Sequence, residues 1–254
     1  MILLHRLTPF AIGIVATLGF ASLFLGWLPP VWCVVVTLLP LAFFYGRLLH
    51  WKMRTFQFWH FFGTPMLYLL ATFGMIFLFE HELAGMILGA LSILFAVLFA
   101  EYIFQYTHLP SQYQPYSIEY ITLILNVLTI FFLSSVGYGT NLLIQTPLWV
   151  LAPIFFLLSL FIQYGTLWVS KADDAHARPY ALAGTLLTTE FFVTFAFLPS
   201  GLYTNAALIT LLFYLFLGLT RAHAHHKLGV AVVRRYVITA SLLFMIIVAS
   251  TAWV

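Results

Sequence analysis

Long apolar runs follow one another along the whole chain, and short segments that contain Pro, Gly, Asn or charged residues separate them. A helix needs about 20 predominantly apolar residues to cross the hydrocarbon core of a bilayer. Nine runs reach or approach that length: 8–28, 30–47, 59–79, 84–104, 117–137, 146–168, 180–198, 202–220 and 236–254. The pattern predicts an all-α, polytopic membrane helix bundle that occupies residues 1–254 as a single transmembrane domain.

The run 30–47 is the shortest of the nine, and Pro40 lies inside it. Proline removes a backbone donor and kinks a helix, and a short interrupted segment is also typical of a re-entrant loop. The sequence therefore leaves eight or nine transmembrane helices open.

Composition agrees with a chain that is embedded in the membrane throughout. Of 254 residues, 63% are hydrophobic and only 7% are charged, whereas soluble domains carry about 25% charged residues. The lipid bilayer is thus the expected partner. A nucleic-acid partner is not expected, because the basic residues lie in short connections between the apolar runs. The single cysteine, Cys33, cannot form an internal disulfide.

The basic residues are distributed unevenly between the predicted connections. If nine spans are counted, all ten Lys and Arg residues fall on the side of the N-terminus, whereas Glu80 and Glu82 fall on the other side. Connections rich in Lys and Arg stay in the cytoplasm. The sequence therefore predicts a cytoplasmic N-terminus, and we expect an integral protein of a bacterial or archaeal plasma membrane.

Two segments that both end in Leu-Pro-Ser resemble each other, 101–111 and 190–200. They suggest three-helix repeats over 1–82, 83–170 and 171–254, with neighbouring repeats inverted. Inverted repeats are typical of transporters. Short apolar matches also arise by chance in a chain with 27 Phe, so the repetition is a hypothesis.

One ionisable residue, Glu190, falls near the middle of the predicted span 180–198. A carboxylate at that depth is costly and marks a functional-site hypothesis. Helical spacing places Thr194 on the same face, and Asn126 is expected at a similar depth in the fifth span. We interpret these three residues as candidate binding residues of a proton- or cation-linked site. The alternative is a protonated Glu190 that bonds Asn126 or a threonine and only holds helices together.

A second polar group surrounds the predicted connection between the fourth and fifth spans. Glu101 precedes this connection and Glu119 follows it, and the residues between them are rich in Tyr and contain no Lys or Arg. This composition is typical of an aromatic belt at headgroup depth. It also suits a cation vestibule, so Glu101 and Glu119 are further candidate binding residues.

Histidines are concentrated on the predicted cytoplasmic side, where His223, His225 and His226 lie closest together. Many histidines at that face resemble the integral-membrane di-iron desaturases and hydroxylases, and the resemblance implies iron bound there. The spacing departs from the HxxxH and HxxHH boxes of those enzymes. The three histidines are therefore weak candidates for metal ligands, and the sequence identifies no cofactor and no catalytic residue.

Three functions stay open. The central carboxylate and the repeats favour a small-solute or ion permease. Short connections and apolar helices also suit a non-catalytic subunit of a larger assembly, bound to other membrane proteins or to copies of itself. The third function, favoured by the histidines, is a membrane-embedded metal enzyme that acts at the cytoplasmic face. The sequence identifies no substrate for any of them.

Overall fold

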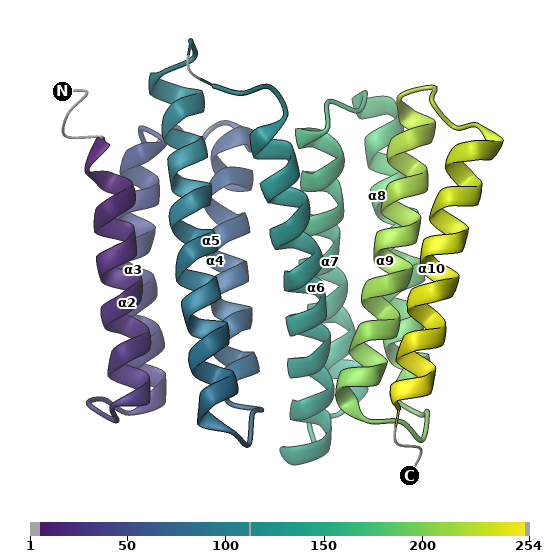
Figure 1. The fold of residues 1–254 in the computed structure, drawn as a ribbon, viewed down its shortest axis with the longest axis horizontal. Coiled ribbons are helices and arrows are strands. Elements are labelled where there is room, and N and C mark those ends of the chain that lie inside the picture. The colour runs from purple at the N-terminus through teal and green to yellow at the C-terminus, as the bar shows by residue number, and fades with distance from the viewer. Residues whose placement is uncertain (1–5, 112, 252–254) are drawn as a thin grey trace. The chain divides into compact units, whose positions relative to one another are not determined.

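The computed structural model describes residues 6–111 and 113–251. Over these ranges the chain forms nine α-helices and no strand, and successive helices run in opposite directions within each half of the chain (Figure 1). The prediction of an all-α helix bundle is confirmed.

Each predicted apolar run coincides with a helix. The first helices are α2 (Thr8–Phe24), α3 (Pro30–Leu48), α4 (Phe56–Ile76), α5 (Glu82–His108) and α6 (Ser117–Leu143). The later ones are α7 (Leu148–Val169), α8 (Asp174–Phe195), α9 (Leu202–Ala224) and α10 (Val230–Ser250). Among the described residues, six helices are long and apolar enough to cross a membrane, namely α3, α5, α6, α7, α9 and α10. The chain is thus a multi-pass helical membrane protein.

Proline starts helices more often than it breaks them in this chain. Pro30 is the first residue of α3, where a missing N–H leaves no helical hydrogen bond unmade, and Pro147 is the N-cap of α7. Pro40 lies inside α3, which nevertheless continues as one helix to Leu48. The structure therefore does not support a re-entrant loop at 30–47.

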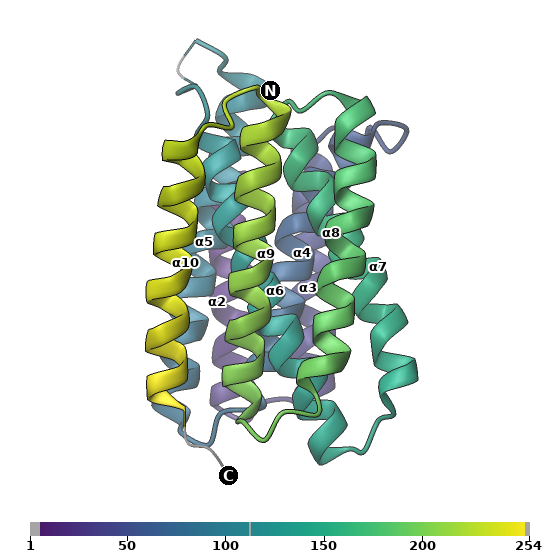
Figure 2. The same cartoon turned by 90° about the vertical axis from the view of Figure 1, so that its right-hand side faces the viewer.

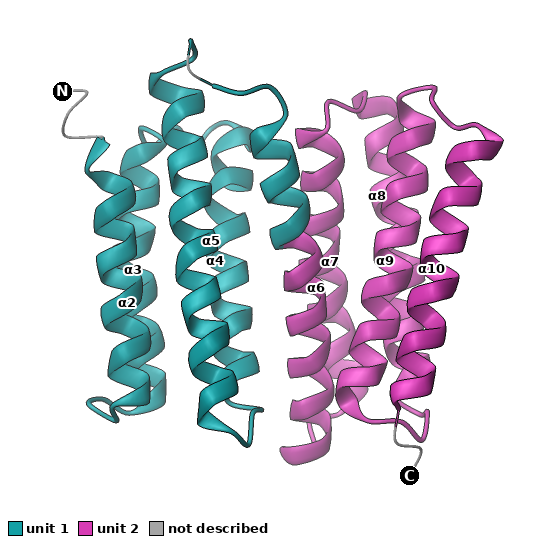
Figure 3. Ribbon diagram, viewed as in Figure 1, with its two compact units in different colours: residues 1–125 teal, residues 126–254 magenta. Residues whose placement is uncertain are grey.

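Contacts divide the chain into two compact units, unit 1 (residues 1–125) and unit 2 (residues 126–254) (Figure 3). The boundary falls inside α6, whereas the predicted repeats would end at residues 82 and 170. The single-domain prediction and the repeat hypothesis are not tested by this division and stay predictions.

Unit 1 contains a closed ring of four helices. α2 packs on α3 and α5, and α4 packs on the same two helices. Across the centre of this ring, Phe20 of α2 stacks on Phe73 of α4 with the ring centroids 4.5 Å apart. Gly19 lets α2 approach α3 closely, because a Cβ at that position would overlap the side chain of Thr37.

Unit 2 has a row of helices in which α7 packs on α8, α8 on α9 and α9 on α10. Tyr138 of α6 joins this row by donating a hydrogen bond of 2.8 Å to the carbonyl oxygen of Phe192 on α8. The Phe192 ring also stacks on Phe155 of α7, with the centroids 4.4 Å apart. α10 lies beside α9 at the edge of this unit (Figure 2). Only 6% of the residues in its most apolar 18-residue stretch are buried.

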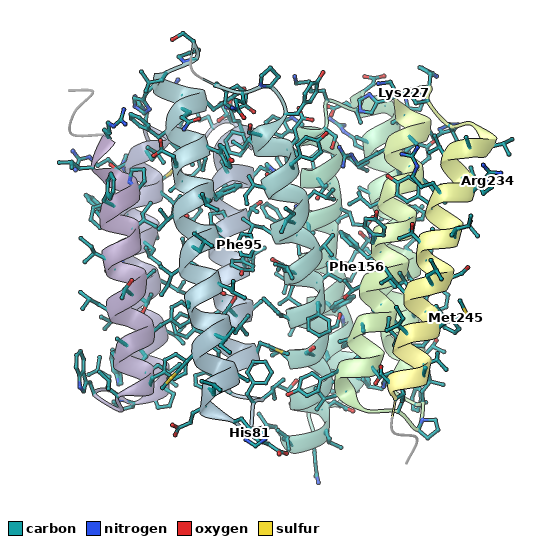
Figure 4. All side chains as sticks on the ribbon, viewed as in Figure 1. His81, Phe95, Phe156, Lys227, Arg234 and Met245 are labelled. Carbon is teal, nitrogen blue, oxygen red and sulfur yellow. The ribbon has the colours of Figure 1, made fainter. Side chains whose placement is uncertain are left out.

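The Lys and Arg residues of each unit gather at one end of its helices, whereas acidic residues are not confined to the other end. In unit 1 the α3–α4 connection carries Lys52 and Arg54, and the α4–α5 connection at the opposite end carries Glu80 and His81 (Figure 4). In unit 2, Lys227 lies in the α9–α10 connection and Arg234 near the start of α10, whereas Met245 lies further along α10 (Figure 4). This distribution of Lys and Arg agrees with the predicted topology, and the cytoplasmic assignment of the basic ends stays a prediction.

Candidate functional site in the polar core of unit 2

The core of unit 2 contains a group of polar side chains where α6, α7 and α8 meet. We call this group the polar cluster, and its five members are all buried. They are Asn126 on α6, Gln163 and Thr166 on α7, and Thr185 and Thr188 on α8.

The sequence of α7 explains why two members point into the core. Ser159, Gln163 and Thr166 are separated by four and then three residues, which places them on one face of a helix. All three are fully buried. The hydroxyls of Ser159 and Thr166 donate to backbone carbonyls of α7 itself, so the amide of Gln163 is the group on this face that must find its partners on other helices.

The two ends of the Gln163 amide have different surroundings. Nε2 donates to Oγ1 of Thr188 at 3.4 Å. Oε1 is buried and has no hydrogen-bond donor among the described residues. A buried polar group without a partner costs about 1–3 kcal/mol, so this oxygen is a costly atom of the cluster.

Gly184 creates the space that the Gln163 amide occupies. A Cβ at position 184 would overlap Oε1 of Gln163 and the ring of Phe216 on α9. One turn later, the Thr188 hydroxyl donates to the carbonyl oxygen of Gly184 at 2.8 Å. The neighbouring hydroxyl of Thr185 is buried and lacks a partner among the residues that the structure describes. Two oxygen atoms of the cluster therefore have free hydrogen-bonding capacity.

Asn126 reaches the same face of α7 from α6. Its Nδ2 donates to Oγ1 of Thr166 at 2.7 Å, and its side chain is almost completely buried. The sequence predicts Asn126 at depth within the fifth span, and the structure buries its side chain in unit 2. Its partner is a threonine of α7, and its part in binding stays a prediction.

Glu190 lies away from this cluster, on the exposed surface of α8. The helix begins at Asp174 and ends at Phe195, so Glu190 lies about 7.5 Å before its end rather than at its centre. The helix extends toward the N-terminus beyond the predicted span 180–198, and in its first turns Asp174 pairs with Arg178 at 3.1 Å. Thr194 donates to the backbone carbonyl of Glu190 at 2.8 Å. The role of both residues in binding stays a prediction.

Glu101 and Glu119 belong to unit 1. Oε1 of Glu101 accepts a hydrogen bond of 3.1 Å from Nε2 of Gln105, one turn later on α5. Glu119 is buried in the first turn of α6. Burial, and to a smaller extent the charge of Glu119, raises the pKa of the Tyr113 phenol, so this phenol stays neutral and accepts from the backbone N–H of Ile118 at 3.3 Å. A cation vestibule at these acids stays a prediction.

The histidines of the α9–α10 region are spread over a helix end and a connection. Nδ1 of His223 lies 2.6 Å from the hydroxyl of Tyr180 on α8, and all three histidines, His223, His225 and His226, are exposed. In the described part of the chain, no group of three or more His, Cys, Asp or Glu side chains is arranged to hold a metal ion. The geometry therefore gives the metal hypothesis no support.

Sequence reasoning overlooked Gln163, although the chain contained a signal. In the run 146–168, Gln163 is the only amide side chain, and its spacing from Ser159 and Thr166 is helical. Gln163 is uncharged, whereas Glu190 is the one ionisable residue of its predicted span and was therefore the more prominent candidate. In the sequence, Gly184 is one of several glycines that allow helices to approach closely, and only the structure connects it with the amide of Gln163.

The polar cluster can offer oxygen atoms of an amide and of hydroxyls inside apolar surroundings. Such atoms accept hydrogen bonds from a polar solute or water, and they replace the hydration shell of a hard cation. Comparison of the chain with models of protein families, with curated proteins and with solved structures finds no match.

Proposed function

We propose that the protein is a small permease for a small polar solute or a monovalent cation, and that the polar cluster of unit 2 is its binding position. The observation that carries the proposal is Oε1 of Gln163, which is buried without a donor among the described residues. A buried acceptor of this kind needs an explanation, and a ligand or water that visits the site is one.

The membrane strengthens this argument. In the hydrocarbon region no bulk water is present to satisfy a polar group, and each unsatisfied group costs several kcal/mol. A leucine or methionine at position 163 would avoid this cost and fill a similar volume. An amide at this position is therefore best explained by a task that an apolar side chain cannot perform.

The chemistry of the cluster narrows the class of ligand. Asn126, Gln163 and the threonines carry no charge and do not titrate, so proton uptake at the cluster itself is not part of the proposal. Carbonyl and hydroxyl oxygens suit a hydrogen-bonding solute, or a cation such as Na⁺ or K⁺ that exchanges water for protein oxygens. The proposal consequently depends on Gln163 and no longer on Glu190.

Permeability of reconstituted vesicles tests the proposal. Liposomes that contain the purified protein are assayed by stopped-flow light scattering with urea and glycerol, and by a voltage-sensitive dye with Na⁺ and K⁺. We expect at least one probe to enter faster than into empty liposomes. Gln163→Leu should lower that rate about tenfold, because a ligand contact of about 1.4 kcal/mol is lost.

Gln145→Leu is the matched control, since Gln145 is exposed in the α6–α7 connection. This variant should retain the permeability of the wild type. Entry of every probe at the rate of empty liposomes would contradict the proposal, and so would equal rates for the wild type and Gln163→Leu.

One observation supports a second candidate, a non-catalytic subunit of a membrane assembly. α10 packs mainly on α9, and 6% of the residues in its most apolar 18-residue stretch are buried. Most of its surface is therefore available to lipid, to another protein or to a second copy. Purification in a mild detergent separates the two candidates. A stoichiometric partner favours the subunit, and a stable monomer with permease activity favours the first proposal.

A further inference from the structure

A small pocket lies in unit 1 between the α3–α4 connection and the last turn of α5. Its volume is ≈ 100 Å³, and its polar lining comes from His50, Lys52, Thr55, Gln57 and Thr107. A water molecule occupies about 30 Å³ in the liquid, so the pocket has room for a group the size of about three waters. A small headgroup or ion fits, and a nucleotide does not.

The lining of this pocket is positive and contains no carboxylate among the described residues. Lys52 supplies an ammonium group. Arg47 and Arg54 lie five residues before it and two residues after it in the chain, so the local field favours an anion. Gln57 adds a side-chain amide with two N–H donors, and His50 adds an imidazole ring.

The N-terminus of α4 adds further donors. Thr55 is the N-cap: its Oγ1 accepts from the backbone N–H of Phe58 at 3.3 Å and donates to the carbonyl oxygen of Lys52 at 2.9 Å. The backbone N–H of Gln57 lies in the first turn of the helix, where such a group has no acceptor within its own helix. The 21-residue helix also places the positive end of its dipole here.

The connection that carries Lys52 has a defined shape. His50 and Trp51 both adopt left-handed backbone conformations, with φ of 56° and 51°, which non-glycine residues adopt at a cost. The Trp51 ring covers Gly46, where a Cβ would overlap it. The His50 ring lies 5.0 Å from the ring of His108 on α5. These contacts fix His50 and Lys52 beside the start of α4.

We infer that this pocket binds one phosphate group. The phosphate can belong to a lipid headgroup or to a free phosphate ion, since both present the same anionic oxygens to Lys52 and Gln57 beside the N-terminus of α4. Clusters of Lys and Arg next to a membrane helix are typical of sites for anionic lipids. This site lies in unit 1 and does not depend on the permease proposal.

Two binding experiments on the full-length protein in a non-ionic detergent test the inference. In the first, inorganic phosphate is titrated and the rise in unfolding temperature is measured. In the second, native mass spectrometry measures retention of phosphatidylglycerol relative to phosphatidylcholine. Lys52→Gln should weaken binding about fivefold, the equivalent of about 1 kcal/mol per basic residue at the membrane surface.

Matched variants separate the pocket from general surface charge. Lys227→Gln removes a cation from the exposed α9–α10 connection and should leave the affinity unchanged, and Lys52→Arg should retain it. Gln57→Leu, which leaves the charge unchanged, should weaken binding about fivefold through the lost hydrogen bond. Gln57→Leu therefore tests the phosphate site even if Lys52→Gln does not fold.

The two experiments also identify the source of the phosphate. Stabilisation by inorganic phosphate indicates a free ion, whereas selective retention of phosphatidylglycerol alone indicates a lipid. Absence of both effects would overturn the inference. Equal losses in Lys52→Gln and Lys227→Gln would overturn it too, because the attraction would then be a property of the whole basic surface.

Discussion

Units 1 and 2 connect their helices through different polar side chains, although each unit also buries polar atoms that lack a hydrogen-bond partner among the described residues, such as Oγ1 of Thr64 in unit 1 and Oε1 of Gln163 in unit 2. In unit 1 the Ser92 hydroxyl of α5 lies 3.1 Å from the hydroxyl of Tyr68 and 3.2 Å from that of Thr72, both on α4. The Tyr45 hydroxyl of α3 donates to the carbonyl oxygen of Ala96 on α5 at 2.8 Å. Hydroxyls thus connect the helices of unit 1 to one another. In unit 2 the central group is an amide with one atom satisfied and one not.

The two units also differ in how completely their helices are packed. α2 to α5 form a ring, whereas the row of unit 2 ends in α10, which is little buried. Between α6, α9 and α10 lies a groove of ≈ 340 Å³ with a mostly apolar lining. Elements with few buried contacts open at a low free energy. If unit 2 holds the proposed binding position, unit 1, with its closed ring of helices, is the more rigid part.

Within unit 2, the largest effect on stability is expected where α7, α8 and α9 meet. Gly184→Val adds a side chain where a single Cβ already overlaps Gln163 and Phe216. Overpacking of this kind costs about 1–3 kcal/mol, and we expect the upper end here. Reversible unfolding in mixed micelles measures it. Gly201→Val is the control, because a Cβ at Gly201 meets no atom within 4 Å. Equal losses in both variants would contradict the close approach.

A smaller loss of stability is expected from the hydroxyl network of unit 1. Tyr68→Phe removes the hydroxyl that lies 3.1 Å from Ser92 and should cost about 1 kcal/mol in unfolding free energy. The permeability of reconstituted vesicles should not change. A permeability loss as large as that of Gln163→Leu would show that unit 1 takes part in the path and would break the comparison.

The smallest effect is expected on α10. Phe244 is 50% exposed, so Phe244→Ala should change the unfolding free energy by less than about 0.5 kcal/mol. Phe73→Ala in the core of unit 1 should cost about 3–5 kcal/mol by comparison. If Phe244→Ala lowered the unfolding free energy as much as Phe73→Ala, or if it released a co-purifying protein, α10 would be an interface. Such a result would support the hypothesis of a non-catalytic subunit.

The helices could be predicted from the sequence, whereas the site could not. Every apolar run became a helix because burial in lipid requires internal backbone hydrogen bonds, a rule that needs no tertiary information. The start of α8 was missed because Asp174 and Arg178 look like a connection until they pair on the same helical face. The predicted length of a membrane span depends on whether charged residues at its end are assigned to the helix or to the connection.

Gln163 shows why the site escaped sequence reasoning. A charge in an apolar run attracts attention, and Glu190 met that criterion, but its direction depends on how α8 rotates against α7 and α9. The structure turns Glu190 outward and Thr185 and Thr188 inward. Whether a buried amide is satisfied depends on atoms of other helices, and no pattern along a single run contains that information.

The unfolding free energy of Gln163→Leu tests the central claim, that this amide is present for a ligand and not for the fold. The variant removes the unsatisfied Oε1, and Thr188 keeps its own hydrogen bond to Gly184. We predict that Gln163→Leu is as stable as the wild type or more stable. A loss of more than about 1 kcal/mol, the contribution of an ordinary structural hydrogen bond, would show that the amide holds the helices together and would contradict the account.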